Sequence, residues 1–466
     1  MKMWSGRFRQ PLDPEFERWQ RSFPFDQRLL QEEILASRAH AKALLAAGVL
    51  SSDEYATMLR GLETLALSGH EFLDDEEAED VHHFVEIHLQ RIIGEVALKL
   101  HAGRSRNEQI ATDLRLFVRS SCDEISTLIS GLVNAITLRA RHSGTAAMPS
   151  YTHLQRAEPV LVAHWLLAYC EMFLRDLDRL HDCRKRLNFC PLGSGAIAGA
   201  TLALDRKLVA AELSFTAPTS NSMDATSDRD FAIEFAQVLS ILAMHLSRWA
   251  EEFILFSTLE YGFVHLPESY STGSSAMPQK QNPDGLELIR GKAGRVMGAT
   301  QQLLITLKGL PLAYNKDMQE TQEPVFVVAE TVSMMLRVAA GFMRDVQFDF
   351  AHMASAATSG YMNAMAAATY LVGKGVPFRR AHEIIGRAVR LGMEQGRELH
   401  EMTLADLRSI SEAFGDDFYA NVTLEAVLDC HDVTGGTARA KVAEALAAME
   451  QQVKQLQEFE AANVHA

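Results

Sequence analysis

The chain contains no proline between Pro24 and Pro149, and this absence constrains its fold more than any other feature. Because proline breaks the interior of a helix, such a stretch favours helices longer than usual. Within it, residues 107–141 carry apolar side chains at three- and four-residue steps, the period of an amphipathic helix. We predict one continuous helix over these residues.

The same period is clearest in a stripe of apolar side chains from Phe231 to Phe256, which lasts roughly eight helical turns. It predicts a helix over residues 227–260, with Ser227 and Asp228 as N-cap candidates. Further helices are predicted over residues 158–186, 284–308 and 323–343. Strand-like alternation is nearly absent, and residues 346–350 are its best candidate.

Helices of about 30 residues need partner helices to cover their apolar faces. The chain is therefore predicted to be all-α, with a long-helix bundle at its centre. We expect three domains: an N-terminal helical domain (1–105), the central bundle (106–354) and a C-terminal helical domain (355–466).

The composition narrows the class of protein. Lysine and arginine number 45 against 60 acidic residues, so the net charge of −15 disfavours nucleic-acid binding. Five cysteines without a CxxC pair indicate reduced thiols. The start of the chain has no apolar signal core, and we found no apolar run of about 20 residues. We therefore expect a cytoplasmic protein without a membrane partner.

Residues 271–284, Ser-Thr-Gly-Ser-Ser-Ala-Met-Pro-Gln-Lys-Gln-Asn-Pro-Asp, form the most distinctive polar segment. Ser274 is followed at short range by the ammonium of Lys280 and the amide of Asn282. Small residues make the front of this segment flexible, so it can close over an anionic substrate. Taken alone, the segment would be read as a turn-rich connector.

Three more polar segments stand at predicted helix boundaries. Residues 101–109 open the first long helix, where free amides favour an anion, and Arg104, Ser105 and Arg106 are predicted to bind substrate there. Residues 151–156 contain Thr152 and His153. Residues 314–320 join two helices. Each could be a solvated cap or turn if it occurred singly.

Other motifs are absent or incomplete. The chain lacks a phosphate-binding loop, a dinucleotide-binding glycine motif and a GxSxG elbow. His82 and Glu86 are one helical turn apart, but no third metal ligand has a usual spacing. We predict no metal and no organic cofactor.

Together these segments resemble the argininosuccinate lyase family of the fumarase/aspartase superfamily. Residues 273–283 resemble the superfamily signature, and residues 101–109 resemble the argininosuccinate lyase form more specifically. Four further segments also resemble the family: Trp4–Phe8, 151–155, 221–230 and 314–319. The resemblance therefore covers essentially the whole chain.

This resemblance implies a three-domain helical subunit and a homotetramer in which several chains build each active site. It implies cleavage of argininosuccinate to arginine and fumarate, the last step of arginine biosynthesis. It further assigns substrate binding to Ser22, Asn107, Thr152, Asn282, Tyr314 and Gln319. Ser274 and His153 would transfer protons, Lys280 would bind a carboxylate, and Glu287 would pair with His153.

The sequence departs from the family pattern at three positions. Gln322 replaces a substrate-binding lysine, a charge that Lys316 is a candidate to supply, while Glu108 replaces an aspartate and Gln281 a basic residue. We expect these changes to alter substrate affinity and not the chemistry.

The residues leave several alternatives open. Ser274 is our choice of base and His153 of acid, but these roles could be exchanged. A sister lyase acting on adenylosuccinate, aspartate or malate shares the signature. A structural protein similar to the delta-crystallins, or a regulator that binds argininosuccinate without cleaving it, would differ by lacking turnover.

Overall fold

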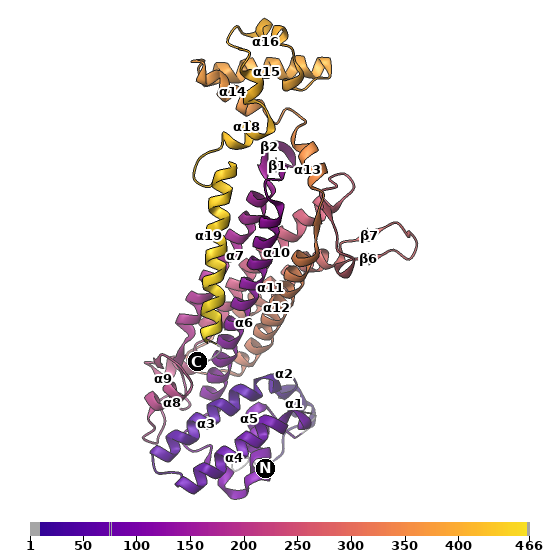
Figure 1. Ribbon diagram of the computed structural model, residues 1–466. Helices are drawn as coiled ribbons and strands as arrows, with labels where there is room; N and C mark the ends of the chain where they lie inside the picture. Colours follow the sequence, from indigo (N-terminus) through magenta and orange to yellow (C-terminus); the bar gives the residue numbers. More distant parts are fainter. Residues whose placement is uncertain (1–9, 74, 76, 464–466) are drawn as a thin grey trace. The chain divides into compact units, whose positions relative to one another are not determined.

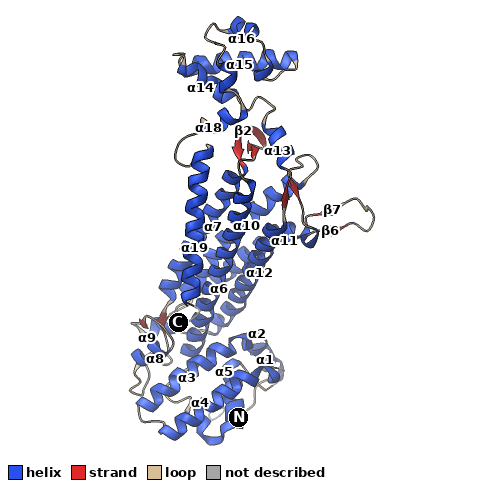
Figure 2. Cartoon of the chain, viewed as in Figure 1, coloured by secondary structure: helices blue, strands red, loops and turns tan. Residues whose placement is uncertain are grey.

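The computed structural model describes residues 10–73, 75 and 77–463, so the Trp4–Phe8 segment lies outside the described residues. Over that part of the chain, helices dominate and strands occur only in short pairs (Figure 1; Figure 2). The predicted all-α class is confirmed.

The chain divides into two compact units, which we call unit 1 and unit 2. Unit 1 comprises residues 1–125, 178–241 and 294–332, and unit 2 comprises residues 126–177, 242–293 and 333–466. Each unit is assembled from three separate segments. This division does not follow consecutive segments of the chain, and the three predicted domain ranges remain a prediction.

The five predicted long helices are present. They are α6 (Arg106–Ser143), α7 (Val162–Leu187), α10 (Asp230–Ser257), α11 (Asp284–Leu307) and α12 (Gln322–Asp345). Four of them match their predicted ranges to within a few residues, because the apolar stripes that predicted them are buried. Trp249 illustrates this in unit 2: it is fully buried, and its ring lies 5.0 Å from that of Phe253 and 5.6 Å from that of Phe342.

The remaining helices of unit 1 surround the N-terminal end of α6. They are α1 (Pro14–Gln20), α2 (Phe23–Asp26), α3 (Leu30–Ala46), α4 (Ser52–Ser68), α5 (Val81–Ile93), α8 (Arg206–Glu212) and α9 (Ser222–Ser227), with 3₁₀ turns η1 (Gln27–Leu29), η2 (Gly69–Phe72), η3 (Gly94–Lys99) and η5 (Lys316–Thr321). Alanines of α3 pack against Leu116 of α6 and against Val209 and Leu213 from the segment around α8. This core holds the start of α6 in place.

The C-terminal part of unit 2 has a core of its own, in which Tyr370, Phe414 and Phe418 are packed ring against ring. Its helices are α13 (Phe350–Ala357), α14 (Ala364–Gly373), α15 (Phe378–Gln395), α16 (Leu404–Ile410), α17 (Phe418–Asn421), α18 (Leu424–Asp429) and α19 (Arg439–Asn463), and unit 2 also holds η4 (Glu268–Tyr270) and η6 (Leu399–Glu401).

Four strand pairs complete the described fold. β1 (Ala147–Thr152) pairs with β2 (Gln155–Leu161), β3 (Phe189–Cys190) with β4 (Ala217–Pro218), β5 (Val264–His265) with β8 (Gln347–Phe348), and β6 (Thr272–Gly273) with β7 (Gln281–Asn282). β8 confirms the strand predicted at 346–350. The predicted start of the second long helix was wrong, because residues 158–161 belong to β2. Pro149 faces Pro159 in this hairpin, and a proline cannot continue a helix through its interior.

Two described helical segments, α10 and residues 316–345, are long and apolar enough to cross a membrane, which the sequence prediction did not find. More than half of each apolar window is buried within the protein. That burial is typical of core helices in a helical bundle. Cys122, Cys170, Cys183 and Cys190 are buried free thiols, whereas Cys430 is exposed.

Candidate active site

The predicted site residues fall into two groups, one in each unit. In unit 1, Ser105 immediately precedes α6: its main-chain N–H donates to Glu108 Oε1 at 2.9 Å, and its hydroxyl accepts from the N–H of Asn107 at 3.4 Å. These are the contacts of a helix cap. Glu108 also accepts from the N–H of Gly195 at 2.9 Å, so the glutamate that replaces the family aspartate fastens the loop around Gly195 to the helix start.

Arg104, also predicted to bind substrate, is enclosed by unit 1. Its guanidinium is fully buried, donates to Ser37 Oγ at 2.9 Å and lies 3.6 Å from a carboxylate oxygen of Glu33. A side chain enclosed in this way holds α3 against the start of α6. Its predicted contact with substrate is not tested by the single chain and stays a prediction.

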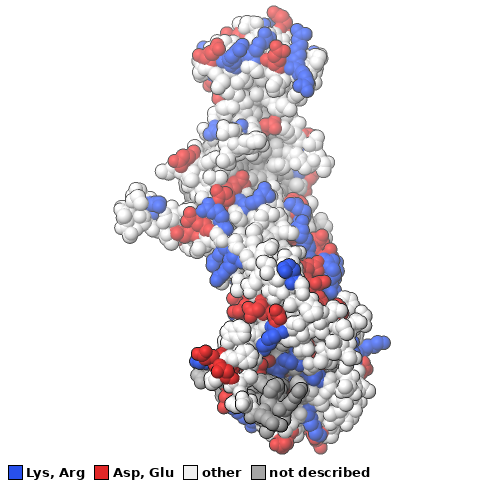
Figure 3. Space-filling view, turned by 180° about the vertical axis from the view of Figure 1, so that it is seen from behind, with Lys and Arg blue, Asp and Glu red and all other residues white. Residues whose placement is uncertain are grey.

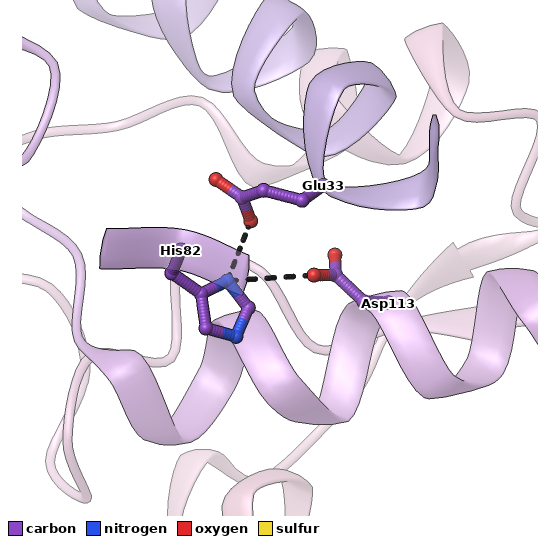
Figure 4. A group of neighbouring side chains, drawn as sticks. All are labelled: Glu33, His82 and Asp113. Atoms are coloured by element: carbon purple, nitrogen blue, oxygen red, sulfur yellow. Dashed lines mark hydrogen bonds and ion pairs between the residues drawn. The ribbon is translucent and has the colours of Figure 1, made fainter. Parts of the chain in front are cut away.

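Figure 4 shows the buried cluster that Arg104 adjoins, with Glu33 from α3, His82 from α5 and Asp113 from α6. His82 Nδ1 lies 2.9 Å from Glu33 Oε2 and 3.5 Å from Asp113 Oδ2. Burial alone would raise the pKa of Glu33, but Arg104 and His82 outweigh it and lower that pKa. Burial, and then the charge of Glu33, raise the pKa of Asp113 well above its ordinary value.

The three side chains have the spacing of metal ligands, but their surroundings do not suit a cation. The oxygens of Glu33 already receive donors from Ser37 and Gln109, and the positive guanidinium of Arg104 stands beside them. A neutral Asp113 would leave Glu33 as the only carboxylate of the three, already paired with Arg104 and His82. We interpret the cluster as a buried hydrogen-bonded ion pair that joins three helices.

The other predicted site residues of unit 1 lie near a second ion pair, between Arg106 and Asp80. Arg106 forms an ion pair with Asp80 at the start of α5. Burial would raise the pKa of Asp80, but Arg106 and His82 lower it. Asp26 lies beside Asp80, since its Oδ1 accepts the N–H of Val81 at 3.0 Å. Burial, and then the charge of Asp80, raise the pKa of Asp26 to about 7. The sequence analysis assigned no role in the site to Asp26 or Asp80, because neither lies in one of the four polar segments.

Ser22, Tyr314 and Gln319 join this neighbourhood, so the structure brings together residues that are almost 300 positions apart. The N–H of Ser22 donates to the carbonyl of Glu79 at 3.0 Å, next to Asp80. The amide of Gln319 donates to the carbonyl of Gln20 at 3.2 Å. Tyr314 is influenced electrostatically by Arg229, Asp80, Arg106 and Asp26.

Gln322, which replaces the usual lysine, also lies in unit 1. Gln322 is buried at the start of α12, and its Oε1 has no hydrogen-bond partner among the described residues. Lys316, the candidate to supply the missing charge, is half exposed and lies 3.7 Å from Glu79 Oε1. Its ammonium therefore already has an anionic neighbour.

In unit 2, Thr152 and His153 stand at the tip of the β1–β2 hairpin, where Thr152 pairs with Gln155. The two turn residues, His153 and Leu154, have φ angles of 55° and 57°. Two-residue hairpin turns of this kind prefer Asn-Gly, because other side chains are strained at positive φ. The fold thus holds an exposed histidine outward on a strained turn, and such strain concentrates at functional sites.

The loop that carries Ser274 connects β6 and β7 and projects from unit 2 (Figure 1). Ser274 Oγ accepts main-chain N–H groups from Ala276 at 3.3 Å and Met277 at 3.1 Å. Asn282 points back to Thr272 Oγ1 at 3.5 Å, and Lys280 is exposed. In the space-filling view the projecting segment carries little charge, whereas acidic and basic side chains are interspersed over the rest of that face (Figure 3).

Glu287 lies on α11, one turn beyond this loop. Its carboxylate is 3.6 Å from Arg290, and among the described residues no hydrogen bond or ion pair links it to His153. Its predicted pairing with His153 is therefore not formed within the single chain and stays a prediction.

Comparison with known proteins gives the class of enzyme to which this chain belongs. The structure is similar to an EDDS lyase variant solved with bound fumarate, with a TM-score of 0.82 and 26% identity over 98% of this chain and 93% of that one. A class II fumarase from Schistosoma mansoni shares the fold, with a TM-score of 0.74 at 15% identity over 86% of this chain and 91% of that one. The lyase family model matches residues 6–298, so the chain is a lyase of this superfamily.

A second model, described as argininosuccinate lyase C-terminal, matches residues 361–429. The argininosuccinate lyase of Koribacter versatilis is 62% identical over 96% of this chain and 97% of its own length. That of Acidobacterium capsulatum is 59% identical over 98% of this chain and 96% of its own length. The chain belongs to the argininosuccinate lyase family.

Proposed function

We propose that the protein cleaves argininosuccinate reversibly to arginine and fumarate, the last step of arginine biosynthesis, in the cytoplasm. The observation that carries this proposal is the full-length similarity to argininosuccinate lyases, which includes the family's own C-terminal region. The predicted proton-transfer residues Ser274 and His153 are present, as are Lys280 and Glu287, whereas Gln322 and Gln281 each replace a basic residue of the family pattern.

The reaction removes a proton from the carbon next to the carbon–nitrogen bond, breaks that bond and forms the double bond of fumarate. The leaving guanidino nitrogen keeps the electron pair of the broken bond and takes up a proton, so arginine departs with its side chain as a guanidinium cation. In the proposed mechanism Ser274 removes the carbon-bound proton and His153 protonates the nitrogen, although the two roles could be exchanged. No metal or organic cofactor is required, since protonation alone activates the leaving group.

The geometry of Ser274 supports its role as base. A free hydroxyl is a very weak base. Ser274 Oγ accepts hydrogen bonds from two main-chain N–H groups, and these favour its anionic form. Lys280, Asn282 and further amides of the same loop would stabilise the doubly negative carboxylate that forms when the proton leaves.

We further propose a homotetramer in which several chains contribute to each active site. Two features support it. His153 is exposed and Ser274 is half-buried in the single chain, and α11 carries exposed Leu288, Met297 and Ile305. Along the same helix a Cβ added at Gly291, Gly294 or Gly298 would meet open space, so another helix can approach closely. Solution mass measured by light scattering should equal four chains of 51.7 kDa.

The substrate assignment is tested by assaying fumarate release by its ultraviolet absorbance. Argininosuccinate, adenylosuccinate, aspartate and malate are supplied in turn to the same preparation. Turnover of argininosuccinate alone is expected. Turnover of another substrate in its place would assign a sister lyase, and binding without turnover would assign a structural or regulatory role.

A further inference from the structure

Glu108 is a buried carboxylate that the mechanism above does not use. It lies in the first turn of α6 and has no exposed surface. One of its oxygens accepts the N–H of Ser105 at 2.9 Å, and the other accepts the N–H of Gly195 at 2.9 Å. Gly195 belongs to a loop between β3 and α8, which we call the 193–199 loop. One side chain therefore joins the start of a long helix to a loop 87 residues further along the chain.

The 193–199 loop is closed on itself. The N–H of Gly199 donates to the carbonyl of Ser194 at 2.8 Å, so the two ends of the loop are tied together. From outside the loop, the hydroxyl of Ser222 on α9 donates to the carbonyl of Ile197 at 2.9 Å. A loop closed in this way keeps its shape, and contacts from its surroundings decide where it stands relative to α6.

The same loop contacts Asn107, the residue before Glu108. The amide nitrogen Nδ2 of Asn107 donates to the carbonyl oxygen of Ala196 at 3.4 Å. A carbonyl oxygen can only accept, so it selects the NH₂ end of the side-chain amide and not the oxygen end. Nδ2 uses one of its two hydrogens on Ala196, so the other N–H and the amide oxygen remain for a ligand. The contact thus fixes how the plane of the amide is turned.

We propose that Glu108 is a positioning residue that orients the substrate-binding amide of Asn107 through the 193–199 loop. The hold of Glu108 on Gly195 places the next carbonyl, that of Ala196, and this carbonyl places the amide. The inference rests on the proposed function, in which Asn107 binds argininosuccinate. It also gives the replacement of the family aspartate by Glu108 a purpose, because the longer side chain reaches the helix start and the loop at once.

Helix α16 shows what a shorter side chain does at this position. Its cap residue Thr403 is followed three residues later by Asp406, as Ser105 is followed by Glu108. The N–H of Thr403 donates to Asp406 Oδ2 at 3.2 Å, so an aspartate reaches the cap residue. Glu108→Asp should therefore keep the contact with Ser105 and lose the contact with Gly195. This substitution releases the loop without removing the helix cap.

A double-mutant cycle tests the proposal in the full-length enzyme. Glu108→Asp should raise KM for argininosuccinate about fivefold and change kcat little, because it disturbs a binding group and not proton transfer. Asn107→Ala removes the amide that Glu108 acts through. In the Asn107→Ala background, Glu108→Asp should therefore add almost nothing. An equal rise of KM in both backgrounds, or no rise with Asn107 present, would overturn the proposal.

Glu54→Asp is the matched control. Glu54 accepts the N–H of Ser51 at 2.9 Å, the same cap contact at the start of α4 in unit 1. Its other oxygen pairs with Lys99 and not with a loop near Asn107. The same shortening should leave KM unchanged there. A KM increase in Glu54→Asp as large as that in Glu108→Asp would show a general effect of shortened caps and contradict a specific role for Glu108.

A measurement without substrate separates this proposal from the proposed function. Hydrogen exchange followed by mass spectrometry, with fragmentation that resolves Gly195, reports the contact directly. The N–H of Gly195 loses its acceptor in Glu108→Asp and should exchange about tenfold faster, while exchange at Ser105 should stay unchanged. Unchanged exchange at Gly195 would overturn the positioning role even in an active enzyme. A wild-type enzyme that leaves argininosuccinate intact would instead refute the proposed function.

Discussion

The hydroxyl oxygen of Ser274 accepts a hydrogen bond from the main-chain N–H of Met277 at 3.1 Å. A second N–H, from Ala276, lies 3.3 Å away. These amides come from the same loop as Ser274, so the loop itself supplies the donors that stabilise an anionic serine oxygen. A serine that is neither capped nor activated in this way would not serve as a base.

Ser274→Ala should therefore reduce kcat by about 10²–10⁴-fold, the usual contribution of a positioned proton-transfer group. Ser275→Ala is the matched control, because the neighbouring hydroxyl is exposed on the same loop. It should retain near-full activity. Steady-state fumarate release decides the matter, and a Ser274→Ala enzyme within a few-fold of wild type would remove Ser274 from the chemistry.

The strained turn of the β1–β2 hairpin leads to a prediction about stability. Leu154 has a φ of 57°, which glycine adopts without strain, so Leu154→Gly should raise the free energy of unfolding by about 0.5–1 kcal/mol. Leu138→Gly is the control, since Leu138 is equally apolar and exposed but lies inside α6. That change should lower the same quantity by about 1 kcal/mol. Chemical denaturation measures both, and equal losses would show that the turn is not strained.

His40 should make stability depend on pH. Burial, and then the charge of Arg104, lower the pKa of His40 from 6.5 to about 3, while its Nε2 lies 2.9 Å from the carbonyl of Ala102. The folded state therefore binds a proton less readily than the unfolded state. The contribution of His40 to the free energy of unfolding is complete above pH 6.5. It is lost as the pH falls toward 3, by up to about 1.4 kcal/mol per pH unit.

His40→Gln keeps a donor for Ala102 but cannot take up a proton, so its unfolding free energy should fall less steeply between pH 7 and pH 4. His142→Gln, at an exposed position of α6, should keep the wild-type slope. The three denaturation series are compared at each pH. Parallel slopes for wild type and His40→Gln would show that His40 does not set the acid sensitivity.

Shared active sites predict that two inactive variants can restore each other. Homotetramers of Ser274→Ala alone, or of His153→Asn alone, should be inactive. If different chains supply the two residues, hybrids formed by mixed refolding should contain some sites with both residues intact. With a charged tag on one variant to separate the hybrids, activity should then reappear in proportion to the hybrid fraction. Hybrids as inactive as their parents would place Ser274 and His153 of each site on one chain.

Much of the fold could be predicted from local patterns. The helix over 284–308 appeared as α11, because its apolar side chains repeat at the spacing of a buried helix face. The β1–β2 hairpin could not be predicted in this way. His153 and Leu154 form its turn without the Asn-Gly signal, so only pairing across the hairpin reveals it. The same holds for Arg104, whose sequence context indicates an anion site but whose side chain is enclosed against Glu33.

The order of residues alone determined the helical class, the long helices and the chemical inventory of the site, since these depend on periodicity and on residue type. Tertiary structure decided which charges face each other. Asp26 and Asp80 became neighbours of Arg106 and Tyr314 only when helices distant in sequence packed together. Electrostatic interactions depend on distance and burial, and neither quantity is written in the local sequence.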